Sequence, residues 1–321
     1  MTQRRLPAVL FCLTHGFSMT APSANARGIQ CLLIATTCLA INDACNKHLA
    51  ATLPVSEIVL LRAVISAAIV TAILAARGEL AGLGAILRPD IMLRSFAESW
   101  IGPFLIIAFA FMSQADVTSI YMVAPVFVAL VGFGHFKEQF SWTILTASLL
   151  ALVGAWLFIN PGGGVLQLVA LLPLAASACQ VLREVISRTM GKKAEGGTQV
   201  SNRVILLSTA LFSMVAAGIL AVFFPWVTPV TAWRWPDPDE WLFLTVASVL
   251  FYLGVAYTYD AYRGSDLSVV APFRYWYLLV AIAAGYVGFG EIPGLRSVAG
   301  MAIIVVAGII VLWHQYGRKS G

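Results

Sequence analysis

An arginine stands next to three aromatic residues near the start of an apolar stretch. Arg274 is followed directly by Tyr275, Trp276 and Tyr277. A guanidinium forms paired hydrogen bonds and stacks on aromatic faces, so Arg274 and Tyr275 could bind a planar, polar metabolite. The alternative is an aromatic belt at the membrane interface with an arginine that extends to the headgroups, and the nearby Asp266 is consistent with it.

A second arginine, Arg62, lies inside another apolar stretch, 56–76. A charge within such a stretch is costly and usually faces protein or water, so Arg62 could bind an anionic group of a substrate. It could also extend to the headgroups, or form a structural ion pair with Glu57 or Asp43.

Three more aromatic residues complete the predicted substrate-binding set: Trp100, Tyr121 and Tyr257. Each has a further aromatic, proline or acidic residue three or four positions on, which places the two on one helix face. Stacking on a substrate is one interpretation. Packing between helices is the alternative, because aromatic residues at helical spacing serve it equally well.

Several carboxylates lie within apolar stretches and could carry a proton across a membrane. Glu98, Asp43 and Glu184 are equivalent candidates, since intramembrane carboxylates form proton relays. Two of them also have a basic residue four positions on, Lys47 after Asp43 and Arg188 after Glu184, so each could form an ion pair on one helix face. Proton coupling therefore stays open at this point.

The composition excludes a water-soluble globule. Of the 321 residues, 60% are hydrophobic and 11% charged, and the mean hydropathy is +0.87, whereas soluble domains carry about 25% charged residues. The net charge is +5, but the sequence contains no long run of basic residues, so we do not expect nucleic acid as a partner. We do expect contact with membrane lipid. The five cysteines suit helix packing, and no P-loop or H-E-x-x-H motif occurs, so we expect no cofactor and no metal.

Ten apolar segments are long enough to cross a bilayer: 29–48, 56–76, 94–113, 117–134, 141–159, 165–187, 203–224, 240–260, 268–289 and 295–314. With the N-terminus inside, fourteen Lys and Arg residues fall on the inner side and three on the outer side: Lys47, Arg234 and Arg296. This bias predicts ten crossings with both termini in the cytoplasm. Residues 1–28 then form a cytoplasmic tail, with a processed signal peptide ending near Ala24-Asn25-Ala26 as the alternative.

The two halves of the chain contain similar stretches. Asp116 to Glu138 and Asp266 to Glu291 both begin on aspartate, contain an Ala-Pro pair and a Gly-x-Gly, and end on glutamate. Five helices per half is an odd number, so the second half would enter the membrane from the opposite side. An inverted repeat of this kind is a recurring transporter architecture. We expect an all-α membrane protein with repeats at 29–160 and 161–314 and a tail at 315–321, and either glutamate could cap the next helix.

These stretches resemble the drug/metabolite transporter superfamily, in particular its EamA-type proteins with ten helices. The residues that carry the resemblance are the acidic starts, the prolines, the glutamates and a glycine in each following helix: Asp116, Pro125, Glu138, Gly154, Asp266, Pro272, Glu291 and Gly300. The first half departs from the pattern where His135, Phe136 and Lys137 separate Gly134 from Glu138. The segments Ala271 to Tyr275 and Phe289 to Pro293 also resemble a subgroup that includes riboflavin and S-adenosylmethionine importers.

The resemblance covers residues 29–314 and implies a secondary transporter that has no ATPase domain and is not an enzyme. We therefore expect a multi-pass protein of the inner (plasma) membrane that moves a small polar or amphipathic metabolite, such as an amino acid, vitamin or nucleoside-like compound, by alternating access. An integral-membrane enzyme and a non-transporting, receptor-like subunit are the alternatives. Either a monomer or a homodimer is consistent with a chain that holds both halves.

Overall fold

The computed structural model describes residues 24–124, 168–194, 200–226, 230–263, 273–274, 276–292 and 294–317, with six more positions between 142 and 154. Residues 1–23 of the predicted N-terminal tail, most of the predicted fourth and fifth helices, the start of the predicted ninth helix, Glu138 and Tyr275 lie outside the described residues. Residues 24–28, predicted to belong to the tail, instead form the start of the helix Ala24–Ala50.

The described residues are helical and contain no strand. The elements are α2 (Ala24–Ala50), α3 (Val55–Ala76), the 3₁₀ helix η1 (Leu80–Leu87), α4 (Pro89–Phe109), α5 (Gln114–Tyr121), α9 (Leu171–Ala194), α10 (Asn202–Phe223), α11 (Pro238–Arg263), α13 (Trp276–Phe289) and α14 (Leu295–Gly317). Five of them, α2, α3, α4, α10 and α11, are long and apolar enough to cross a membrane.

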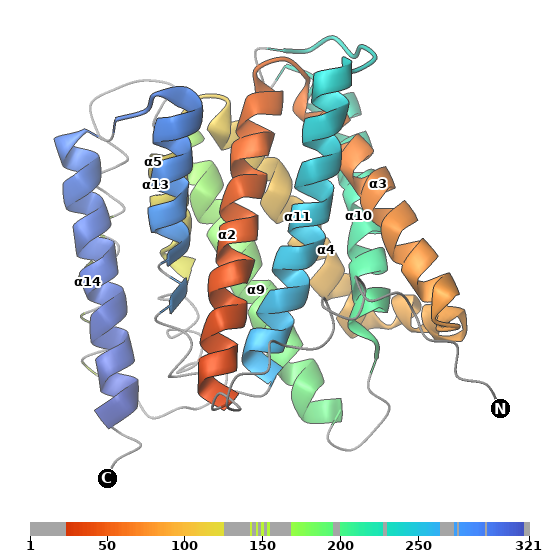
Figure 1. The fold of residues 1–321 in the computed structure, drawn as a ribbon, viewed down its shortest axis with the longest axis horizontal. Helices are drawn as coiled ribbons and strands as arrows, with labels where there is room; N and C mark the ends of the chain where they lie inside the picture. Colours follow the sequence, from red (N-terminus) through yellow and green to blue (C-terminus); the bar gives the residue numbers. More distant parts are fainter. Residues whose placement is uncertain are drawn as a thin grey trace.

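The helices form one upright bundle with α2 near its centre (Figure 1). α2 packs against α11 on one side and α13 on the other, α3 packs against α10, and α4 packs against α9 and α10. α14 lies at the edge of the bundle, and its last residues are at the same end as the first residues of α2 (Figure 1).

Two clusters of buried apolar side chains fill the spaces between these helices. One joins α2, α4, α5, α9 and α13 around Ile120 and Phe109. The other joins α2, α3, α4, α10 and α11 around Leu49 and Ile58. The polar groups described below are therefore buried in an apolar surrounding that strengthens charge–charge interactions.

The predicted helix bounds agree with the structure within a few residues in most cases. The predicted segment 165–187 differs most, since α9 runs from Leu171 to Ala194, and α4 also differs clearly. The predicted segment 94–113 is a helix from Pro89 to Phe109. It begins early because proline fits the first turn of a helix, where no backbone N–H is needed. It ends early because Ser113 starts the next helix, its Oγ accepting from Asp116 N at 3.1 Å.

Candidate functional site

A group of polar side chains is buried between α2, α3 and α13, and we call it the Asp43 cluster (Asn42, Asp43, Asn46, Arg62 and Tyr277). The three α2 residues and Tyr277 are each less than a tenth exposed. The Asp43 carboxylate accepts from Asn42 Nδ2 at 2.8 Å on Oδ1 and from the Tyr277 hydroxyl on Oδ2. The cluster thus joins residues that are far apart in the sequence around one carboxylate.

Arg62 reaches this carboxylate through an amide. Its Nη2 donates to Asn42 Oδ1 at 2.6 Å, and its guanidinium lies 5.8 Å from the centre of the Phe251 ring of α11. The charges of Arg62 and Asp43 act on each other. Of the two carboxylates named as possible partners of Arg62, Asp43 is the one linked to it, through the Asn42 amide. Glu57 instead accepts from the backbone N–H of Arg234 at 3.4 Å.

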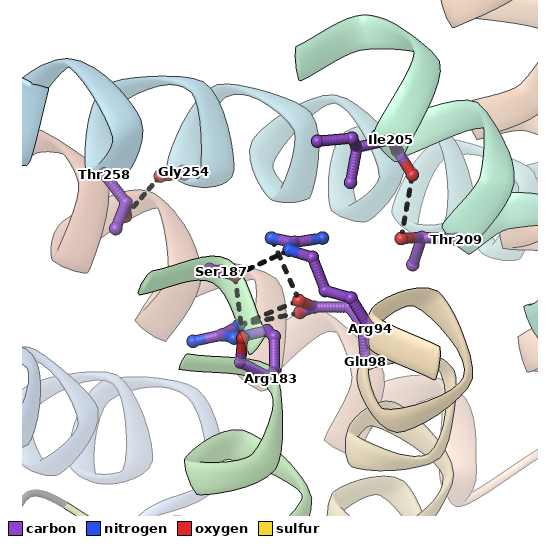
Figure 2. A network of polar contacts seen from close by, with 8 residues as sticks. All are labelled: Arg94, Glu98, Arg183, Ser187, Ile205, Thr209, Gly254 and Thr258. Atoms are coloured by element: carbon purple, nitrogen blue, oxygen red, sulfur yellow. Dashed lines mark hydrogen bonds and ion pairs between the residues drawn. The ribbon is translucent and has the colours of Figure 1, made fainter. Parts of the chain in front are cut away.

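A second charged group, the Glu98 cluster, lies between α4 and α9 (Arg94, Glu98, Arg183 and Ser187). Figure 2 shows the two arginines pointing toward the Glu98 carboxylate from different helices. Arg183 Nη1 donates to both oxygens of Glu98, at 2.8 and 3.0 Å, and Arg94 Nη2 lies 3.8 Å from Oε2. Arg94 Nε also donates to Ser187 Oγ at 2.8 Å. The Glu98 side chain is only 7% exposed, so it is a buried carboxylate with cations on two sides.

Tyr121 connects the two clusters. It is buried on α5, and its phenol lies within electrostatic range of Arg183 and Glu98 from one cluster and of Asp43 from the other. The charge of Arg274 acts on the same phenol. Of the six residues predicted to bind substrate, the structure therefore brings Arg62, Tyr121 and Arg274 toward one polar region of the bundle.

The other predicted site residues are placed differently. Trp100 stacks in a row along α4, with its ring centre 5.7 Å from that of Phe104 and 6.4 Å from that of Phe96, which is the packing alternative. Tyr257 is half-buried on α11, six residues beyond Phe251.

Arg274 is half-buried in a short 3₁₀ turn before α13. Tyr275, the residue after it, lies outside the described residues. Trp276 donates through Nε1 to Thr37 Oγ1 of α2 at 3.0 Å. The aromatic run noted in the sequence is thus linked to α2 by Trp276 and, through the Asp43 cluster, by Tyr277.

Glu291 joins three segments at one end of the bundle. It forms an ion pair with Lys47 of α2, and its Oε2 accepts from the backbone N–H of Gln114, the first residue of α5, at 2.9 Å. Gly290 makes this possible because it ends α13 with a φ of 65°, a conformation that favours glycine. Lys47 Nζ also donates to the backbone carbonyl of Met112 at 2.8 Å.

Two sequence-based pairings are therefore wrong. Asp43 does not pair with Lys47, because Lys47 lies against Glu291 while Asp43 turns toward Asn42 and Tyr277. Glu291 meets the N-terminus of α5 rather than that of the following helix. Spacing within one helix cannot reveal such partners, since they come from helices distant in the sequence.

Sequence reasoning also missed the partner of Glu98. Arg183 stands next to Glu184 in the sequence, yet its guanidinium binds Glu98, 85 positions away. A usable signal existed: α4 and α9 each carry a charged residue within an apolar stretch, and buried opposite charges are found paired. The side chains of Glu184 and Arg188 are not described.

The chemistry available to these clusters is recognition and proton exchange. Guanidinium groups can orient anionic or carbonyl groups, phenols can stack or donate, and buried carboxylates can bind protons. Within the described residues, no group of three His, Cys, Asp or Glu side chains could hold a metal ion.

Part of the chain matches a known protein family, and several named proteins are similar to it. Residues 26–160 match the EamA-like transporter family. The chain is 23% identical over 286 residues to a pseudopaline exporter of Pseudomonas aeruginosa, and the aligned region covers 87% of this chain and 94% of that protein. It is 26% identical over 205 residues to a riboflavin transporter of Vibrio cholerae, covering 63% of each.

A further relative is an S-adenosylmethionine uptake transporter of Rickettsia prowazekii, 21% identical over 209 residues, 63% of this chain and 64% of that protein. Among solved structures, one crystal structure of a protein superposes with a TM-score of 0.58 at 19% identity and covers 90% of this chain and 96% of that one. The similarity to that structure shows a shared fold.

Proposed function

We propose that this chain, whose residues 26–160 match the EamA-like transporter family, is a secondary active transporter of the drug/metabolite transporter superfamily. It is a multi-pass protein of the inner membrane and not an enzyme. It moves a small polar or amphipathic organic metabolite by alternating access. The residues that bind the substrate are Arg62, Tyr121 and Arg274, with Trp100, Tyr257 and Tyr275 as further members of the predicted set.

The proposal includes an inverted repeat of two five-helix halves with both ends in the cytoplasm. The order of packing supports it. Exchanging the halves relates α2 to α9, α3 to α10, α4 to α11 and α5 to α13. Under this exchange the contact α2–α11 becomes α9–α4, α2–α13 becomes α9–α5, and α3–α11 becomes α10–α4, and each of these contacts is present.

The observation that carries the transport proposal is the pair of buried charged clusters. Asp43 and Glu98 are both less than a tenth exposed, and both lie where helices of the two proposed halves meet. Buried charge inside a helical membrane protein is costly and marks substrate or ion pathways. Transporters with inverted repeats place their site at the repeat interface.

The substrate class follows from the side chains around these clusters. Arginines select anionic or carbonyl groups, and the aromatic residues favour a flat or amphipathic body. The similar proteins are named as transporters of pseudopaline, riboflavin and S-adenosylmethionine. These names differ in substrate and include both an exporter and an uptake transporter, so a panel that covers amino acids, vitamins and nucleoside-like compounds is the appropriate search.

The test is uptake of this panel into proteoliposomes that contain the purified protein, with and without a pH gradient. We compare wild type with Arg62→Gln and Arg274→Ala, and use Arg88→Gln as the control. Arg88 is likewise an arginine but pairs with Asp90 at the start of α4, with its side chain 41% exposed. Flux of one compound that is lost in the first two variants and kept in the control supports the proposal.

Flux that survives both substitutions would show that these arginines do not bind the substrate. No flux of any compound, with the protein folded and inserted, favours a receptor-like subunit instead. Ligand-induced thermal stabilisation without flux would support the same alternative, because a ligand that binds the folded state raises its stability whether or not it is moved.

A further inference from the structure

The two buried carboxylates of the candidate site have different surroundings. Glu98 accepts two hydrogen bonds from the Arg183 guanidinium and has Arg94 at 3.8 Å. Cations at this distance favour the charged form of a carboxylate. The Glu98 carboxylate is therefore already occupied by two cationic partners.

Asp43 is held by uncharged donors. Its carboxylate accepts from the Asn42 amide and the Tyr277 hydroxyl, and the uncharged Asn46 amide also acts on it. Within the part of the chain that the structure describes, no Lys or Arg side chain forms an ion pair with it. Arg62 acts on it only across Asn42.

The groups around Asp43 come from several of the helices packed against α2. α3 contributes the Arg62 guanidinium, α13 the Tyr277 phenol and α5 the Tyr121 phenol, which both Asp43 and Glu98 of α4 influence electrostatically. From α11 the described neighbour of Arg62 is the uncharged ring of Phe251. On α2 itself, Cys45 lies within electrostatic range.

We propose that Asp43 is the proton-binding residue of this transporter and that its protonation frees Arg62 to bind an anionic group of the substrate. The inference rests on the proposed transport function and names both the coupling ion and the charge of the substrate. Burial penalises an ionised carboxylate that lacks a direct cation, so binding a proton is the simplest way to remove the charge.

An acceptor for the acid proton is already in place. A protonated carboxyl gains an O–H donor that needs a partner. Asn46 is 2% exposed, its amide acts on Asp43, and its buried Oδ1 has no hydrogen-bond partner. Rotating this amide by half a turn presents Oδ1 to the acid. The unpaired oxygen is thus explained as the site where the proton of Asp43 is received.

Arg62 has a matching unsatisfied donor. Its Nε is buried without a partner, while Nη2 is held by Asn42. When Asp43 becomes neutral, Arg62 loses the negative charge that balances it, and a carboxylate or phosphate of the substrate can replace that charge. Proton and anion therefore favour each other's binding, and the factor is the same in both directions.

Each transport cycle then carries one proton with each anionic group bound at Arg62. The proton enters on Asp43 from the side that loads the substrate and leaves to water on the other side. No bond other than O–H is made or broken, and a substrate with a single negative charge crosses without net charge movement.

The first experiment observes the proton directly. Infrared difference spectra of the full-length protein in liposomes are recorded between mildly alkaline and mildly acidic buffer. We expect the carbonyl band of a buried carboxylic acid to appear on acidification in wild type and in Glu98→Gln, and to be absent in Asp43→Asn. A band that persists in Asp43→Asn, or that is lost in Glu98→Gln protein shown by tryptophan fluorescence to be still folded, overturns the assignment.

The second experiment adds the anion. Benzoate, with benzamide as its uncharged match, probes Arg62 without knowledge of the natural substrate. Benzoate should move the appearance of the acid band toward alkaline pH by about one pH unit, which corresponds to a tenfold coupling, and benzamide should not. Arg62→Gln should abolish the shift. An equal response to both compounds, or none to benzoate, rejects the link between proton and anion.

These outcomes separate the inference from the proposed function. An acid band that depends on Asp43, together with no flux of any metabolite, would refute transport and leave the proton site standing. Metabolite flux that keeps its response to a pH gradient in Asp43→Asn would refute the proton site and leave transport standing.

Discussion

Replacing Glu98 by glutamine should be one of the most destabilising single changes in the described part of the chain. Glu98 accepts from Arg183 at 2.8 and 3.0 Å and lies 3.8 Å from Arg94. The variant removes the anion and leaves two guanidinium groups facing each other in a largely apolar interior. Removing one partner of a buried ion pair costs about 3–5 kcal/mol, and we expect a loss in this range. The hydrogen bond from Arg94 to Ser187 remains and keeps the loss from being larger.

The measurement is detergent-induced unfolding in mixed micelles, followed by tryptophan fluorescence. Glu79→Gln is the matched control, because Glu79 also pairs with an arginine, Arg203, but both side chains are more than a quarter exposed. Water screens such a pair, so the control should change stability little. The double variant Glu98→Gln with Arg183→Met should lose clearly less stability than the sum of the losses in the two single variants, since each change removes a charge that the other left unpaired.

The reasoning fails if Glu98→Gln and Glu79→Gln are equally stable. It also fails if the losses of stability from Glu98→Gln and Arg183→Met are strictly additive, because additivity would mean that the two side chains have no interaction energy.

Three further outcomes can be measured in the same way. Gly254→Ala should cost about 1–3 kcal/mol by overpacking, because a Cβ there would lie 2.7 Å from Leu39 Cγ, whereas Gly218→Ala meets nothing within 4 Å and should be neutral or stabilising. Glu291→Gln should cost about 2 kcal/mol, from the lost ion pair and the weakened helix cap, and should speed amide exchange at the start of α5. The hydrogen bond from its arginine partner lowers the pKa of Glu79, so the stability difference between wild type and Glu79→Gln should be fully present above the ordinary carboxyl pKa and disappear as the pH falls through the lowered value.

Much of the architecture is predictable because it depends on apolar length. The apolar stretches at 56–76 and 203–224 correspond to α3 (Val55–Ala76) and α10 (Asn202–Phe223), since a bilayer sets the number of apolar residues in a crossing. The early start of α4 and the 3₁₀ helix η1 depend on local capping and turn geometry at Pro89. These features produce little signal in a hydropathy pattern.

The candidate site could be predicted in kind but not in its pairings. Charged residues inside apolar stretches were correctly selected as unusual, and Arg62 does lie beside Asp43. The partners of Glu98 and Lys47, however, are 85 and 244 positions away. Such contacts depend on which helices pack together, and one sequence gives the faces of each helix without giving its neighbours.

Because the chain is synthesised from its N-terminus, the contacts of Glu291 with Gln114 and Lys47 can form only late in synthesis. The first backbone N–H of α5 belongs to Gln114, and the carboxylate that caps it is encoded 177 positions later. At about 5–20 residues per second, synthesis of that interval takes roughly 9–35 s. Throughout it α5 and Lys47 wait in the membrane or the insertion machinery without this partner. A nascent chain that stops short of Glu291 therefore keeps the Ser113 cap of α5 but leaves the Gln114 N–H without its acceptor and Lys47 without its carboxylate.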